Sequence, residues 1–252
     1  MGHTGTLDPF ATGLLVVLLG RATRLARYLS GLPKTYLATA RLGQATTTDD
    51  LTGTPIEPPK DPGGVTDEQV RTVLAGLAGQ RLQRPPPFSA KRIAGERSYQ
   101  RARRGEAVEL EPVAVTIHAI ALVEYRNPDL TFRTTVSAGT YVRALGRDVG
   151  AVLGTGAHLT ALRREAIGPL RVENAVALDR LAPETPLLSP LEVLRHLPAA
   201  ELDATARARV AHGNAIRHPG LPEGAVALVS GHTLVAVAHT SGEWVKPEVV
   251  LE

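Results

Sequence analysis

Several common features are missing from this chain of 252 residues. It contains no cysteine, which excludes disulfide bonds and thiolate metal sites. The apolar run GLLVVLLG (residues 13–20) is far too short to cross a membrane, and the first residues lack the pattern of a secretory signal. The eight histidines are scattered without ligand spacing. We therefore expect no metal, no membrane association and, by default, a cytoplasmic location.

Lysine is also scarce. Only four lysines occur, so arginine supplies most of the positive charge behind the net charge of +3. Arginine offers a planar fork for phosphates and a face that stacks on bases. Basic residues gather in KRIAGERSYQRARRG (residues 91–105), namely Lys91, Arg92, Arg97, Arg101, Arg103 and Arg104. This pattern is typical of a solvated helix face, and a loop that grips RNA is the alternative.

Hydrophobic periodicity indicates a mixture of helices and strands. Apolar residues at helical spacing predict helices over residues 21–32, 66–80 and 140–154. Stretches rich in β-branched and apolar residues predict strands over residues 34–43, 112–125 and 130–139, and the first of these alternates between apolar and polar residues. Thr66 and Gln69 form a capping box at the start of the second helix. The run GLLVVLLG is compatible with a buried strand or with the start of a helix.

The C-terminal part has a composition of its own. A linker rich in proline covers residues 181–192. A short helix over residues 202–214 follows, with Asp203 as its cap. Two apolar runs separated by Gly231-His232 then predict a hairpin. The tail is therefore expected to form a small module rich in strands.

The opening loop, GHTGTLDPFATG (residues 2–13), is the most unusual stretch. It lacks the motifs of a phosphate-binding loop, and its aspartate would repel phosphate. An aspartate before proline is common in turns, so Asp8 is compatible with a purely structural role. The alternative is that Asp8 acts as a nucleophile or general base. Such a carboxylate must stay ionised, which favours an arginine partner. Arg143, in SAGTYVRALG, is a candidate, although an isolated arginine is typical of a surface.

The ordered motifs resemble one family over residues 2–180. GHTGTLDPFATGLL is similar to the signature loop of the pseudouridine synthases, and in particular of the bacterial tRNA pseudouridine synthase B family. The supporting motifs are KTYLATARLG, TTTDDLTG, PPPFSAKRIAGERSYQRARRG, SAGTYVRALGRDVG and GTGAHLTALRR, in that order. The resemblance implies an isomerase that converts uridine to pseudouridine at position 55, in the T-loop of tRNA. It also implies a monomer that needs no metal or cofactor.

The resemblance assigns roles to individual residues. Asp8 matches the essential aspartate, which attacks the uridine while the C1′–N1 bond is cut and C5 becomes the point of reattachment. Arg143 matches the arginine that pairs with this carboxylate. The residues that match the pocket of the flipped uracil and the opened RNA loop are Tyr36, Tyr141, Leu162 and His3. From the residues alone, the strand pattern favours a core aromatic at Tyr36, and an ordinary core position is also compatible with Leu162.

Further segments match parts that contact the RNA. Lys34 and the Phe88–Arg104 stretch match segments that close over the RNA, and Asp50 matches the rim of the site. Recognition is then expected to depend on RNA shape and backbone, with binding that weakens as salt rises. Taking the base out of its stack costs a few kcal/mol.

The fold that the resemblance implies is α/β (α+β): a pseudouridine synthase fold with a mixed, mostly antiparallel central sheet and a cleft. It places a catalytic domain over residues 1–182 and a PUA-like RNA-binding module over 190–252. Family members carry a few dozen residues before the signature loop, including a KPxGxTS-like segment. Because such a segment is absent here, we expect Met1 to be a truncated or mis-assigned start and the cellular protein to be longer.

Two other functions compete with this one. An RNA-binding or RNA-remodelling protein would keep the basic loop and the tail but would not need Asp8. A nucleoside hydrolase or glycosidase would need a second acid, and no glutamate stands in a comparable loop. Tritium release from C5-labelled uridine, compared between the wild type and Asp8→Asn, separates the first of these from the isomerase.

Overall fold

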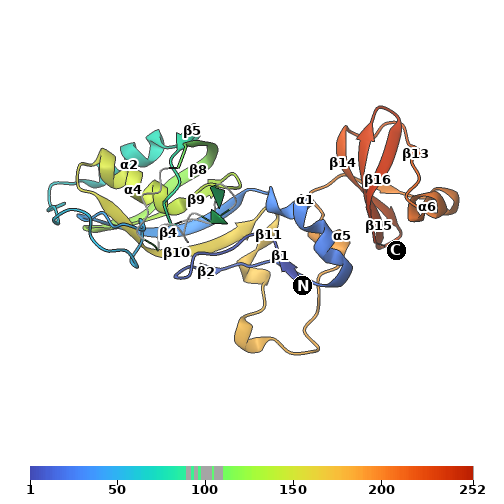
Figure 1. Cartoon of the computed structure of the whole chain (residues 1–252), viewed down its shortest axis with the longest axis horizontal. Coiled ribbons are helices and arrows are strands. Elements are labelled where there is room, and N and C mark those ends of the chain that lie inside the picture. Colours follow the sequence, from blue (N-terminus) through green and yellow to red (C-terminus); the bar gives the residue numbers. More distant parts are fainter. Residues whose placement is uncertain (89–91, 94–95, 98–103, 105–109, 252) are drawn as a thin grey trace. The chain divides into compact units, whose positions relative to one another are not determined.

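The computed structural model describes residues 1–88, 92–93, 96–97, 104 and 110–251 (Figure 1). The chain forms two compact units. We call Leu7–Leu14 with Pro33–Ile167 the sheet unit, and Met1–Thr6 with Leu15–Leu32 and Gly168–Glu252 the terminal unit. The predicted domain boundaries at residues 182 and 190 stay a prediction.

The sheet unit is built on one mixed sheet with the strand order β10-β4-β9-β8-β5. Its strands are β4 (Lys34–Leu42), β5 (Gly79–Gln83), β8 (Val113–Arg126), β9 (Asp129–Val136) and β10 (Ala157–Ile167). These strands all pair antiparallel, and the short β2 (Thr12–Gly13) pairs parallel with β10. The expected mixed, mostly antiparallel sheet is therefore confirmed.

Two helices cover one face of this sheet: α2 (Asp67–Gly76) and α4 (Val142–Val152) (Figure 1). Their apolar stripes meet the inward side chains of the strands in one core, which includes Val70, Leu74, Leu145, Val149 and Phe132. The capping box of Thr66 and Gln69 is present as predicted. Helix α2 ends earlier than predicted, because Gly79 adopts a positive φ of 96° and begins β5.

Strand β4 shows the predicted alternation, with Tyr36, Ala38, Ala40 and Leu42 buried on one side. Two short strands, β6 (Arg92–Ile93) and β7 (Glu96–Arg97), pair antiparallel with each other. The run GLLVVLLG is not a single buried element. It contributes to β2 and to β3 (Val17–Leu18). Leu14 and Leu18 are buried, while Leu15, Val17 and Leu19 are exposed.

The terminal unit contains a five-stranded sheet with the order β12-β14-β15-β16-β13. Its strands are β12 (Ala199–Glu201), β13 (Ile216–Arg217), β14 (Gly224–Ser230), β15 (Thr233–Ser241) and β16 (Trp244–Val250). Helix α6 (Ala204–Ala211) packs on it and is capped by Asp203. The predicted hairpin is confirmed, since Ser230 pairs with Thr233 across Gly231-His232. This is the small module rich in strands that the tail predicted.

The rest of the terminal unit comes from both ends of the chain. It includes β1 (Gly2–His3), which pairs with β3, and α1 (Ala26–Ser30), which follows a 3₁₀ helix over Gly20–Leu25. The short elements β11 (Leu170–Arg171) and α5 (Pro190–Val193) lie further along, with 3₁₀ turns at Val172–Asn174 and Leu178–Arg180. Arg24 and Arg27 tie the α1 segment to β16, through Val250 O and the Glu248 carboxylate.

No helix in the described part of the chain has the length and apolar character needed to span a membrane.

Candidate active site

The site is organised around the first turn of α4. Tyr141 is the N-cap residue of this helix, and Arg143 is its second residue. The main chain at Tyr141 is held by Gln83 at the end of β5. The Gln83 side-chain oxygen accepts from Tyr141 N at 2.8 Å, and its amide donates to Tyr141 O at 3.1 Å. A buried amide that meets both backbone groups of one residue leaves that residue little freedom. The start of α4, and with it Arg143, is therefore fixed to the sheet.

Arg143 uses every N–H of its guanidinium. Nε and Nη2 donate to the two carboxylate oxygens of Asp8 at 3.0 and 3.1 Å. Nη1 donates to Thr48 O at 2.8 Å and to Asp50 at 3.2 Å, and Nη2 also donates to Phe88 O at 2.9 Å. Since arginine has five N–H donors, the side chain is held in a single orientation. The predicted partners Asp8 and Arg143, 135 residues apart, are thus brought together.

The Asp8 carboxylate is held without being enclosed. Its backbone oxygen accepts from Ala11 N at 2.9 Å, which closes the turn through Pro9 and Phe10. Its side chain is 32% exposed, whereas that of Arg143 is only 6% exposed. A two-pronged contact of this type is the strongest geometry for an arginine and a carboxylate. The arrangement presents an oriented carboxylate to solvent, as a reaction with an external substrate requires.

Asp50 is the second carboxylate of the site, and it is buried. One of its oxygens accepts from Thr48 Oγ1 at 2.7 Å and from Thr52, through N at 2.9 Å and Oγ1 at 2.6 Å. The other oxygen faces Arg143. Thr48 and Thr52 of its own loop therefore orient Asp50 independently of Arg143. Asp50 in turn holds Arg143 on the side opposite Asp8. The sequence had associated Asp50 with the rim of the site, without this contact.

A neighbouring ion pair joins Asp49 to Arg147, one helical turn after Arg143, with 2.9 Å between Nη1 and Oδ2. Burial raises the pKa of Asp49 from 3.8 to about 6, and the positive charges of Arg147 and Arg143 offset part of this rise. Asp49 also has a φ of 59°, which asparagine tolerates. Asp49→Asn is therefore a suitable variant to isolate the effect of this charge.

We expect the stability difference between the wild type and Asp49→Asn to depend on pH. The folded state binds the Asp49 proton more tightly than the unfolded state, so this group stabilises the fold below about pH 4. Its contribution is lost as the pH rises through about 6. Relative to Asp49→Asn, the wild type should lose up to roughly 3 kcal/mol of unfolding free energy between pH 4 and 7.5. Urea unfolding at several pH values measures this, and a difference that stays constant with pH would contradict it.

Tyr36 and Leu162 lie on the adjacent strands β4 and β10, on the side of the sheet that carries the core. Burial raises the pKa of Tyr36, the charge of Arg164 opposes the rise, and the negative charge of Asp8 adds to it. The charge of Asp8 therefore acts on the Tyr36 phenol, although less than burial and Arg164 do. Both side chains also belong to the core cluster, so the two interpretations that the sequence left open are compatible.

The other predicted residues are distributed more widely. Lys34 is buried at the start of β4, where burial, aided by the charge of Arg164, lowers its pKa. His3 lies in the terminal unit, and its Nδ1 accepts from Gly5 N at 3.3 Å. Arg104 is exposed. Lys91, Arg101 and Arg103 lie outside the described residues, as do the side chains of Arg92 and Arg97. Contact of any of these residues with RNA stays a prediction.

Several residues of the site escaped the sequence interpretation, among them Gln83, Asp49, Arg147 and Arg164. Each is a polar residue at a position that the structure buries or half-buries. For Arg164 a signal was available, because it is two residues from Leu162 on one strand and therefore faces the same side. In the part of the chain that the structure describes, no group of three or more His, Asp or Glu side chains could hold a metal ion.

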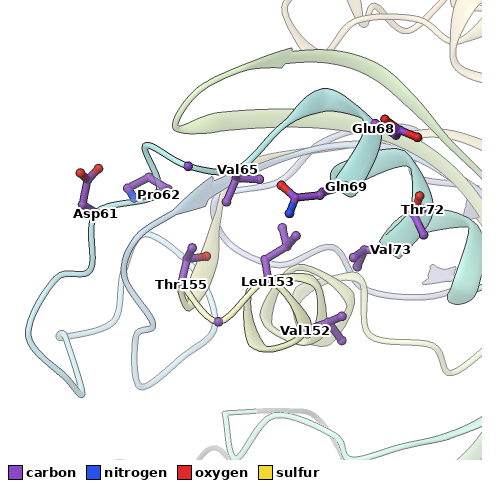
Figure 2. A pocket seen from close by; sticks show the side chains of 12 residues that line it. Asp61, Pro62, Val65, Glu68, Gln69, Thr72, Val73, Val152, Leu153 and Thr155 are labelled. Carbon is purple, nitrogen blue, oxygen red and sulfur yellow. The ribbon is translucent and has the colours of Figure 1, made fainter.

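A groove of about 640 Å³ opens elsewhere on the sheet unit, between α2 and the C-terminal end of α4 (Figure 2). Its walls include Glu68, Gln69 and Val73 from α2, and Leu153 and Thr155 from the turn that follows α4. None of the predicted site residues lines it. We therefore do not assign the candidate site to this groove, despite its volume. The candidate site is the cluster of charged side chains around Arg143.

Comparison with known proteins shows the family to which the chain belongs. The profile of the TruB family pseudouridylate synthases (N-terminal domain) matches residues 1–142, and that of the tRNA pseudouridylate synthase B C-terminal domain matches residues 143–192. A tRNA pseudouridine synthase B from Thermobifida fusca (strain YX) is 45% identical over 96% of this chain and 86% of its own length. One from Burkholderia mallei (strain NCTC 10247) is 45% identical over 86% of this chain and 73% of its own.

Solved structures share the fold. A chain in a Cbf5–Nop10–Gar1 complex matches with a TM-score of 0.75 at 27% identity, and covers all of this chain and 76% of that one. A chain in an H/ACA RNP bound to a substrate RNA containing 2′-deoxyuridine matches with a TM-score of 0.74 at 25% identity and the same coverage. The resemblance indicated by the motifs is thereby confirmed, and the chain belongs to the TruB family of pseudouridylate synthases, which makes it an isomerase.

Proposed function

We propose that this protein isomerises uridine 55 in the T-loop of tRNA, with Asp8 as the catalytic carboxylate. The observation that carries the proposal is the two-pronged contact between Asp8 and Arg143, which leaves a third of the Asp8 side chain exposed. The relatives named above are tRNA pseudouridine synthases, which supports tRNA as the RNA substrate. A monomer acting in the cytoplasm, without metal or cofactor, is part of the same proposal.

The geometry supports a division of labour among the residues. Asp8 attacks the flipped nucleotide, the C1′–N1 bond is cut, and the uracil is reattached through C5 with loss of the C5 proton. Arg143 orients the carboxylate and offsets its negative charge, and Asp50 keeps Arg143 in place. Tyr36 stacks on the uracil, and its phenol assists the loss of the C5 proton. Leu162 and Tyr141 complete the pocket around the base.

The RNA has to present the base outside its stack, which costs a few kcal/mol. A folded T-arm with a strained loop lowers this cost, so we propose that the enzyme recognises the shape of the arm. The six basic residues of 91–104 and the strand-rich tail would supply contacts to the phosphates. Such contacts carry little sequence information, which leaves the choice of uridine to the geometry of the loop.

The position of the reaction is the direct test. With an unmodified tRNA transcript labelled at uridine C5, we expect release of one tritium per tRNA, and chemical mapping of the product should place pseudouridine at position 55. Replacing U55 by cytidine should abolish release, while a matched replacement of a uridine in the anticodon loop should not. An isolated T-arm should remain a substrate. Release that maps to another position, or that persists without U55, would contradict the proposal.

A further inference from the structure

Arg164 is the largest side chain among those that are almost fully buried in the described part of the chain, with 1% of its surface exposed. It lies on β10, facing the same side as Leu162. Burying a guanidinium removes its hydration, so such residues are rare and depend on hydrogen bonds to the protein. The division of labour proposed above does not use Arg164, and the cost of burying it therefore calls for another role.

The segment Leu7–Leu14, which carries Asp8, is called the Asp8 loop below. The first role of Arg164 is to hold the end of this loop at Leu14. Its Nε donates to Leu14 O at 2.7 Å, and its backbone oxygen accepts from Leu14 N at 2.8 Å. Both backbone groups of Leu14 are therefore bound by one residue. Gly13 pairs with Arg164 in register and has a φ of 102°; a Cβ there would lie 2.3 Å from Arg164 O. The residues that follow Asp8 therefore lie in close contact with Arg164, at Gly13 and Leu14.

Arg164 also contacts Tyr36. The two residues are register partners on the adjacent strands β10 and β4. The charge of Arg164 and a side-chain hydrogen bond from it both act to lower the pKa of Tyr36. Arginine has only donors, so the tyrosine oxygen is the acceptor in this bond and its O–H must point to another partner. The positive charge also favours the ionised phenol, against the burial that disfavours it. One guanidinium therefore reaches both the Asp8 loop and the tyrosine.

We propose that Arg164 is a positioning residue, which fixes Tyr36 relative to the Asp8 loop and orients and polarises its phenol. This inference rests on the proposed function, in which Tyr36 contacts the base and assists the loss of its C5 proton. The guanidinium acts through Tyr36 and Leu14, and it does not need to touch the RNA. Its effect is on the rate of the reaction rather than on the affinity for tRNA.

The first test needs no RNA and is therefore independent of the proposed function. Tyrosine carrying ¹³C at Cζ reports the titration of each phenol by NMR, and the Tyr36 signal is identified by its loss in Tyr36→Phe. In Arg164→Gln the pKa of Tyr36 should rise above its wild-type value. Arg163→Gln, which removes an exposed arginine from the adjacent position of β10, should leave it unchanged. An unchanged Tyr36 titration in Arg164→Gln would overturn the proposal.

The second test measures the reaction and uses the conservative variant Arg164→Lys, which keeps the charge but loses the fork that reaches both partners. With an unmodified tRNA transcript, we expect the single-turnover rate to fall about 100-fold, with the Kd for tRNA changed less than about threefold. In a Tyr36→Phe background the same change should cost less than about tenfold, because the phenol oxygen is gone. Equal losses in both backgrounds would overturn the proposal and leave Arg164 a purely structural role.

Discussion

Asp8→Asn is expected to abolish tritium release from C5-labelled uridine in tRNA, with a loss of at least about 10⁴-fold in the single-turnover rate. Asparagine has nearly the same shape and can still accept a hydrogen bond from Arg143, so the loop should keep its conformation. The amide has no charge and is a poor nucleophile, which removes the chemistry while sparing the structure. The affinity for tRNA should stay within a few-fold of the wild type.

The control for this change is Asp61→Asn. Asp61 lies in a turn outside the site, where its carboxylate accepts from Gly63 N at 2.8 Å. Its replacement should leave the rate unchanged. Full activity in Asp8→Asn would reject the assignment of the catalytic residue. A wild-type protein that binds tRNA but releases no tritium would instead favour the RNA-binding or RNA-remodelling alternative.

The second large effect is expected at Arg143, in both stability and rate. Arg143→Ala leaves Asp50 buried and without its positive partner, and it leaves Thr48 O and Phe88 O without this donor. Removing one side of a buried ion pair typically costs about 3 kcal/mol or more of unfolding free energy. Arg143→Lys keeps the charge but has three donors for five contacts, so we expect a milder loss of stability and a rate lower by about 10²–10³-fold.

Arg133 is a matched control in the same unit. It makes a two-pronged contact with Glu165 at 2.8 and 3.1 Å, yet its side chain is 52% exposed. Exposed pairs contribute little, so Arg133→Ala should cost less than about 1 kcal/mol. Denaturant unfolding and single-turnover kinetics on both arginines measure the contrast. Equal stability losses at Arg133 and Arg143 would show that burial of the Arg143 network has no energetic consequence.

Much of the local structure could be predicted from short patterns. The alternation of KTYLATARLG predicted the buried side of β4, and the capping box at Thr66 predicted the start of α2. The hairpin across Gly231-His232 followed from two apolar runs at the right separation. These features depend on interactions within a few residues, so a window of sequence contains their causes. The run GLLVVLLG failed as a predictor, because the exposure of its leucines depends on strand partners outside any such window.

The composition and the ordered motifs determined, without the structure, the family resemblance and the identity of Asp8 and Arg143 as candidates. Only the tertiary structure decided what surrounds them. Asp50 rather than Asp49 faces Asp8 across Arg143, Gln83 fixes the start of α4, and Arg164 lies beside Tyr36 on the adjacent strand. These contacts join residues far apart in the chain, and their geometry is set by the register of β4, β10 and β5. Because a one-residue slip of a strand turns every side chain to the other face, no local pattern could have specified them.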